Sequence, residues 1–363
     1  MPNASQCVSR VAVIGAGIGG AACAAGLRAA GLDVVLFDKS RGLGGRMATR
    51  RARWAMPDGH EVMAEFDHGA QHFTARHARF RATVARAAAS GVVVPWQPRV
   101  HAGFALGTDR PLHVPVPGMP ALCRHLAGAV PLRTEHAVQR LQRHADGWQL
   151  VMADGATAGP FDQVMLALPA AQAAVLLAGH HDAWADGLAA LPMHACWTLM
   201  LATDEVDWPW DAAEPPKGPL AWVLRNDRKP GRSAPAGIAT WVAHATPAWS
   251  ADHLEAEPRA VAEALCAALA ALVPASPGLR VHHASVHRWR YAMPAERVDG
   301  AADCWWDETL GLGVCGDAFG DGQIEAAWRS GDELADTVAC ALDAAGSTGD
   351  VGGAMGRESA VQV

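Results

Sequence analysis

A glycine-rich turn near the start of the chain carries the strongest chemical signal in the sequence. The apolar run 11–14 precedes it, and a helix-forming stretch to residue 30 follows it. A strand that ends in such a turn brings bare backbone N–H groups and a helix N-terminus to one point, where a pyrophosphate group can sit. The turn therefore predicts a nucleotide-binding site, formed by Gly15, Ala16, Gly17, Ile18, Gly19 and Gly20.

A second apolar run, 33–37, ends in Asp38. An acidic side chain at the tip of the second strand, about 20 residues after the glycine turn, can accept both hydroxyls of an adenosine ribose. A basic loop, 39–46, comes next and contains Lys39 and Gly45. Its glycines let the backbone pass close to a ligand, and Arg46 offers a forked donor for phosphate. Together these parts predict a βαβ unit that binds a dinucleotide.

The last structured part of the chain repeats this arrangement. An apolar run, 310–315, leads into Gly316 and Asp317, and a helix is expected from Ile324 to Ala344. A strand, a Gly-Asp turn and a helix N-terminus form a second polar pocket. Joined with the first turn, Asp38 and the basic loop, this pocket predicts one extended cofactor site.

Several motifs resemble a known family. The strings GAGIGG, FDKSRGLGGRMATRR and FDHGAQHFTAR occur in that order and are similar to the flavin-dependent amine oxidase superfamily, specifically its renalase-like branch. Segments 222–230, 240–246 and 287–292 extend the resemblance to about residue 340. The resemblance implies a non-covalently bound FAD. It implies backbone contact from Val138 to the adenine, a ribityl contact from Asp317, and cofactor binding by Gln323 and Ile324.

The resemblance also implies an activity. Renalase-like enzymes oxidise the 2- and 6-dihydro isomers of NAD(P)H to NAD(P)+, transfer the hydride to flavin N5 and pass the electrons to oxygen as peroxide. The chain has one tyrosine and three lysines, so it cannot form the tyrosine pair that holds the amine in many amine oxidases. Oxidation of an amine or other metabolite remains the first alternative, and a flavin-binding sensor or scaffold without turnover is the second. The segment 318–327 departs from the pattern of this branch.

Loss of hydride from a dihydronicotinamide restores an aromatic ring, so positioning matters more than a strong base. Flat rings and hydrogen-bonding groups are therefore the candidates for the substrate side. The alternatives are core packing for the tryptophans and histidines, and a solvated loop for Arg225, Arg228 and Lys229. The candidate catalytic residues are Gln71, His72, Trp222, Trp241 and Trp289, and the candidate substrate-binding residues are Arg225, Trp222 and His244.

Alternating strand-like and helix-like runs predict an α/β fold. We expect a discontinuous Rossmann-type FAD-binding domain and a second α+β substrate domain with a mixed or antiparallel sheet. The FAD-binding domain is expected at 8–75, 130–185 and 301–345, and the substrate domain at 76–129 and 186–300. The glycine-rich segment 346–363 is expected to be a disordered tail.

Composition narrows the partners. The chain has 363 residues and a net charge of −7, which disfavours nucleic acid and anionic membranes. Its eight cysteines form no CxxC pair, as expected for reduced thiols, and its histidines show no metal-ligand spacing. The sequence thus predicts a cytoplasmic oxidoreductase with a small-molecule substrate and molecular oxygen as partners, and leaves the oligomeric state open.

Overall fold

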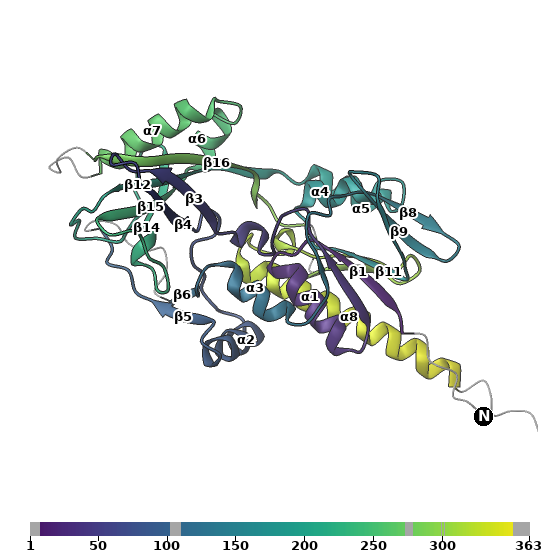
Figure 1. Cartoon of the computed structure of the whole chain (residues 1–363). Helices are drawn as coiled ribbons and strands as arrows, with labels where there is room; N and C mark the ends of the chain where they lie inside the picture. The colour runs from purple at the N-terminus through teal and green to yellow at the C-terminus, as the bar shows by residue number, and fades with distance from the viewer. Residues whose placement is uncertain (1–7, 102–109, 273–278, 299, 301, 351–363) are drawn as a thin grey trace, which may run out of the picture.

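The structure is a computed structural model, and it describes residues 8–101, 110–272, 279–298, 300 and 302–350. Two sheets dominate it, each with its own helices (Figure 1). None of the helices in the described part is long and apolar enough to cross a membrane.

The first sheet has the order β17-β18-β11-β1-β2-β7. Every neighbouring pair is parallel except β17 with β18. The apolar residues of β1 are fully buried, which is typical of a parallel sheet covered on both faces. The strands are β1 (Arg10–Ile14), β2 (Asp33–Phe37), β7 (Leu132–Arg133), β11 (Gln163–Leu166), β17 (Trp305–Asp307) and β18 (Leu312–Val314).

Small residues let two helices approach closely on one face of this sheet. Helix α1 (Ile18–Ala29) lies along α8 (Ile324–Asp350), drawn in yellow (Figure 1). A Cβ atom added at Gly331 would lie 2.0 Å from the backbone oxygen of Gly19. Helix α8 continues to Asp350, so the predictions of a helix end at 344 and of a disordered tail from 346 are wrong for 346–350. Residues 351–363 lie outside the described part.

On the other face, β8 (Val138–His144), β9 (Gly147–Met152) and β10 (Thr157–Phe161) form an antiparallel meander. It shares an apolar core with the two helices that follow it, α4 (Ala170–Leu177) and α5 (Asp182–Ala190).

The second sheet is antiparallel and has the order β13-β14-β15-β12-β16. Alternate residues of its strands face opposite sides. One side packs against α7 (Pro258–Ala270) around a tryptophan-rich core, and the short α6 (Pro247–Asp252) contacts β12. The hairpin of β3 (Arg50–Ala55) and β4 (Glu61–Phe66) covers the other side. The sheet strands are β12 (Met193–Asp204), β13 (Ala212–Ala213), β14 (Leu220–Arg225), β15 (Ile238–Ala245) and β16 (Val281–Pro294).

The segment 76–129 requires a correction. Helices α2 (Ala78–Ala89) and α3 (Pro120–Ala127) bury their apolar faces in the core around β1 and α1, so they belong with the nucleotide sheet rather than with the substrate domain. The hairpin between them, β5 (Val93–Trp96) with β6 (Leu112–Pro115), and the described residues 99–101 of its connection also reach β13 or β14. The physical reason is that helical periodicity identifies an apolar face but not the surface that covers it.

Candidate active site

One cavity of about 580 Å³ lies between the two sheets. Its walls come from the start of α1, the loop before the 3-10 helix Gly45–Met47, residues 69–74, the large sheet and the start of α8. The nucleotide sheet contributes the carboxyl ends of its strands, the edge at which open α/β sheets bind ligands.

The glycine turn makes the cofactor end of this cavity. Gly15 has a φ of +106°, and a Cβ atom there would lie 2.3 Å from the oxygen of Ala167. At Gly20 an added Cβ atom would lie 1.8 Å from the oxygen of Gly15. Gly17 is different, because it lines the cavity and no atom lies within 4 Å of an added Cβ. Thus Gly15 and Gly20 permit the tight turn, and Gly17 leaves room for a ligand at the N-terminus of α1.

Asp38 lies beside the turn. Its Oδ2 accepts the Ala16 N–H at 2.7 Å and its Oδ1 accepts the Ser40 N–H at 2.7 Å. A carboxylate has about four acceptor positions, so two remain for ribose hydroxyls. Lys39 donates to Gln172 at 3.3 Å, and Val138 is half-buried at the start of β8. Asp38, Lys39 and Val138 lie outside the cavity lining, and their roles at the adenosine end remain predictions.

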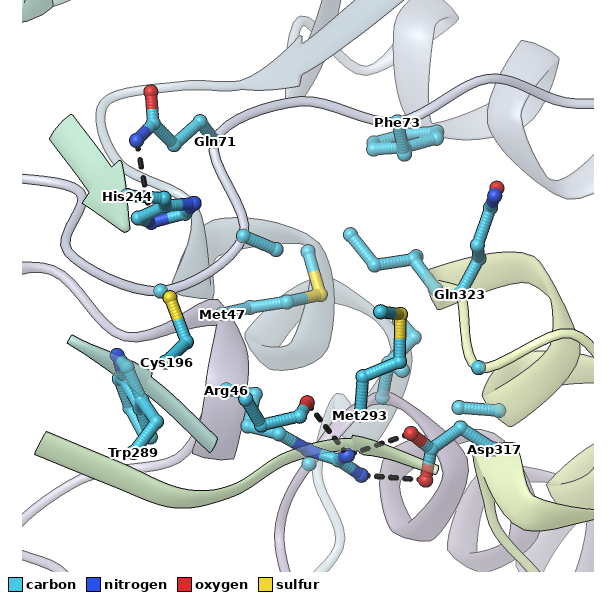
Figure 2. A pocket seen from close by; sticks show the side chains of 18 of the residues that line it. Arg46, Met47, Gln71, Phe73, Cys196, His244, Trp289, Met293, Asp317 and Gln323 are labelled. Atoms are coloured by element: carbon cyan, nitrogen blue, oxygen red, sulfur yellow. Dashed lines mark hydrogen bonds and ion pairs between the residues drawn. The ribbon is translucent and has the colours of Figure 1, made fainter. Parts of the chain in front are cut away.

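Arg46 and Asp317 meet in the cavity wall, although they are far apart in the sequence. The guanidinium of Arg46 donates twice to the Asp317 carboxylate, both at 2.6 Å, and once to the oxygen of Ala292 at 3.2 Å. Figure 2 shows this pair at one side of the cavity, close to Gln323. A bidentate pair fixes the relative position of the two loops, so the predicted pocket from the C-terminal Gly-Asp turn does adjoin the first one.

The opposite wall carries the predicted substrate-side residues. The side-chain amide of Gln71 lies 3.3 Å from Nε2 of His244, and Trp289 lies on the same side (Figure 2). Trp289 donates its Nε1–H to the oxygen of His68 at 3.0 Å. Three buried atoms at this wall have no hydrogen-bond partner in the described structure: Oε1 of Gln71, Nδ1 of His72 and Nε1 of Trp222.

His72 and His244 are uncharged at neutral pH. Burial and the nearby Lys229 lower the pKa of His72 to about 4. Burial lowers the pKa of His244 to about 4 as well, against hydrogen bonds with the backbone at His68 and Gly69. A group with such a pKa is a weak base at pH 7, but it can donate or accept a neutral hydrogen bond.

The structure brings most of the predicted site residues together. Gly45 belongs to the same loop as Arg46 without lining the cavity, as Gly15 and Gly20 support the turn without facing it. The predicted residues that line the cavity are Gly17, Ile18, Gly19, Arg46, Gln71, His72, Trp222, His244, Trp289, Gly316, Asp317, Gln323 and Ile324.

Two predicted substrate residues do not reach the cavity. Trp241 is 0% exposed and packs with Trp208 and Trp210 on the α7 side of the large sheet. Arg225 lies over the ring of Trp241 and donates to Asp227 and to the oxygen of Val206. Both predictions are therefore wrong, and the reason is the face of the strand on which each side chain lies.

Other residues that line the cavity were not predicted from the sequence. Met47 and Met293 lie between the two walls, and the thiol of Cys196 faces the substrate side (Figure 2). Burial raises the pKa of this thiol to about 11, so it is not a thiolate nucleophile. Cys196 and Met293 lie in strands of the large sheet, and Met47 follows Arg46 in the basic segment. No local signal separates these side chains from core residues.

A Rossmann-type sheet and an antiparallel sheet that enclose one cavity define an enzyme with a dinucleotide cofactor and a separate substrate domain. Residues 13–87 match a family model described as an NAD(P)-binding Rossmann-like domain. Residues 100–339 match the model of the flavin-containing amine oxidoreductases. The chain therefore belongs to the flavin-containing amine oxidoreductase family, and it is an FAD-dependent oxidoreductase.

Solved structures share the fold at low identity. Cyclohexylamine oxidase from Brevibacterium oxydans IH-35A has a TM-score of 0.68 and 13% identity, covering 93% of this chain and 100% of its own. A protein from Exiguobacterium sp. 255-15 assigned as a protoporphyrinogen oxidase has a TM-score of 0.67 and 14% identity, covering 92% and 99%. A redesigned putrescine oxidase has a TM-score of 0.63 and 12% identity, covering 92% and 99%.

The cavity residues fit FAD. The open space at Gly17 and the N-terminus of α1 suit the pyrophosphate. Asp38 retains acceptor positions for the ribose, and Arg46 and Asp317 offer a donor and an acceptor nearer the substrate wall. The volume lies in the range of roughly 300–1,000 Å³ typical of ligand sites.

Proposed function

We propose that this protein oxidises the 2- or 6-dihydro isomers of NAD(P)H to NAD(P)+, as renalase-like enzymes do. The dihydronicotinamide loses a hydride, and O2 takes up the two electrons with that hydrogen and one proton to give H2O2. Bound FAD supplies the two-electron acceptor at N5. The residues of this chain bind the substrate ring, orient it and exclude water.

The observation that carries this proposal is the wall opposite the cofactor end, where Gln71, Trp222 and the histidines 72 and 244 are uncharged at neutral pH. Two residues of this wall each carry a buried polar atom without a partner in the described structure: the acceptor Oε1 of Gln71 and the donor Nε1–H of Trp222. A primary carboxamide has one acceptor oxygen and two N–H donors, so it complements these atoms. The rings of Trp222 and Trp289 add flat apolar surface on which an aromatic ring can stack.

The protonation states support the same reaction. The pKa values of about 4 at His72 and His244 make both weak bases at pH 7. Formation of an aromatic pyridinium by hydride loss needs no strong base, because the substrate gives up no separate proton at the reacting carbon. These histidines therefore suffice as hydrogen-bonding groups that position the ring.

Oxidation of a small amine is the alternative. Glu214 lines the cavity, and a carboxylate there favours an alkylammonium substrate. Against it, the single tyrosine, Tyr291, is 36% exposed and is not among the residues that line the cavity. The carboxylates of Asp317 and Glu325 are engaged by Arg46 and by the backbone N–H groups of residues 76 and 77.

An anaerobic reduction experiment tests the proposal. The FAD-loaded protein is mixed with 2- and 6-dihydro isomers of NADH and NADPH, with ordinary NADH and with a panel of amines, while the flavin absorbance near 450 nm is followed by stopped flow. We expect rapid bleaching by a 2- or 6-dihydro isomer and slow or no bleaching by ordinary NADH. Bleaching by amines alone would establish the alternative, and no bleaching by any compound would favour a sensor or scaffold.

A further inference from the structure

A fully buried ionic cluster lies behind the substrate-side wall. The side chains of Asp67, Lys229 and Arg232 are 0%, 0% and 2% exposed. Lys229 Nζ donates to Oδ2 of Asp67 at 2.5 Å, and Arg232 Nε donates to the same oxygen at 2.9 Å. The Thr49 hydroxyl donates to Oδ1 of Asp67 at 2.6 Å. The expectation of a solvated or phosphate-binding loop is therefore wrong for Lys229.

The cluster carries more positive than negative charge. Two cations share one carboxylate, and burial of ions costs several kcal/mol each unless they are well paired. Burial lowers the pKa of Lys229 to about 8, against the attraction of Asp67. Both cations belong to the short segment 226–232. Asn226 anchors this segment further, because its side-chain amide donates to the backbone oxygen of Glu65 at 2.9 Å. A cost of this kind calls for a role in the site.

The cluster connects directly to the cavity wall. Asp67 begins the segment 67–74, of which residues 69–74 line the cavity. Other anchors of the segment are the bond from Trp289 to the oxygen of His68, the bond from the Ala70 N–H to the oxygen of Arg46 at 2.8 Å, and the two backbone bonds between Phe73 and His113 at 3.0 and 2.8 Å. Only the Asp67 anchor is ionic, and it fixes the point where the segment leaves β4.

We propose that Lys229 and Arg232 are positioning residues that hold Asp67 so that Gln71 and His72 face the substrate. The substrate contacts of Gln71 and His72 are those of the proposed function, on which this inference rests. The groups that face His72 are Lys229, His244 and the rings of Trp96 and Trp222. Those that face His244 are Gln71, Lys229, the rings of His68 and His72, and the backbone at 68–69.

The test compares two substitutions of one residue in the FAD-loaded enzyme. Lys229→Met removes the charge and the donor, and Lys229→Arg keeps both. We expect kcat/KM at pH 7 to fall by about 10- to 100-fold in Lys229→Met, the loss that a misplacement on the order of 1 Å produces. The acid limb of the kcat/KM–pH profile of Lys229→Met should move to higher pH, because removal of a nearby positive charge makes histidine protonation easier. In Lys229→Arg, which keeps the charge, the acid limb should lie at the same pH as in the wild type.

A second measurement needs no turnover. Titration of the histidine ring resonances by NMR in the oxidised holoenzyme should show higher pKa values for His72 and His244 in Lys229→Met than in the wild type or Lys229→Arg. If Lys229→Met does not fold, Arg232→Gln removes the second donor to Asp67 and leaves the Lys229–Asp67 pair. An upward shift at His72 is again expected, because a loosened segment 67–74 buries this ring less. Unmoved histidine titrations would overturn the proposal. A protein that shows these shifts without oxidising dihydronicotinamides would contradict only the proposed function.

Discussion

Replacement of Gly17 by alanine should weaken FAD binding while leaving the apoprotein folded. Gly17 has φ −74° and ψ −174°, which alanine adopts freely, and no atom lies within 4 Å of the added Cβ. The loss at this N-cap position is about 1 kcal/mol or less. An extra methyl group forced into a packed contact costs roughly 1–3 kcal/mol. FAD pressed against Gly17 should therefore bind about 5- to 150-fold more weakly.

The assay has two parts. FAD fluorescence quenching during titration of apoprotein gives the dissociation constant, and urea unfolding of the same apoprotein gives its stability. Gly187→Ala is the matched control, because its Cβ would be 3.6 Å from Trp305 in a helix remote from the cavity lining. Gly20→Ala should instead disrupt the fold, since its Cβ would clash with the backbone of Gly15. An unchanged dissociation constant in a folded Gly17→Ala protein would refute the proposed place of the pyrophosphate.

Further predictions concern the wall and the core. Trp222→Phe keeps a flat ring but removes the Nε1–H, so kcat/KM for the dihydronicotinamide should fall about tenfold, the value of one hydrogen bond of roughly 1.4 kcal/mol; an unchanged value in steady-state kinetics would exclude that bond. Trp241→Ala should destabilise the protein by about 3–5 kcal/mol in urea unfolding without changing the KM of the folded fraction. A raised KM would show that Trp241 contacts the substrate after all. The pKa values of His72 and His244 are about 4 in the folded protein and 6.5 ordinarily. As the pH falls, the unfolded chain therefore binds protons at these histidines before the folded protein does, and the free energy of unfolding should decrease between about pH 6.5 and pH 4. Urea unfolding at several pH values checks this, and a free energy that does not change with pH would contradict it.

The cofactor end could be predicted from the sequence because its signals are local. The tight turn requires glycine at Gly15 and Gly20 for contacts within a few residues or with the adjacent strand. The order of motifs then predicted that Asp317 belongs to the same cofactor site as the basic loop, and Asp317 does form an ion pair with Arg46 of that loop. The Rossmann-type sheet and the antiparallel sheet were predictable for the same reason, because their strands have clear apolar runs.

The substrate side depends on long-range packing, which no local pattern contains. Trp222 and Trp241 lie on neighbouring strands, and Trp222 is paired in register with His244, whereas Trp241 is paired with Arg225. Positions 241 and 244 face opposite sides of one strand, so one side chain reaches the cavity and the other the core beneath α7. Lys229 pairs with Asp67, which lies 162 positions away in the sequence. The polar sequence around Lys229 does not indicate that this side chain is buried.

The pairing of Arg46 with Asp317 sets an order of events during synthesis of the chain. These residues are 271 positions apart, so translation at about 5–20 residues per second separates them by on the order of 15–55 s. In that interval the glycine turn has emerged, but its partners on β18 and α8 have not. The nascent chain thus carries an incomplete cofactor site with the α8-facing side of α1 uncovered. Uptake of FAD is consequently a late step, and chaperones have the opportunity to bind the uncovered helix before the cofactor does.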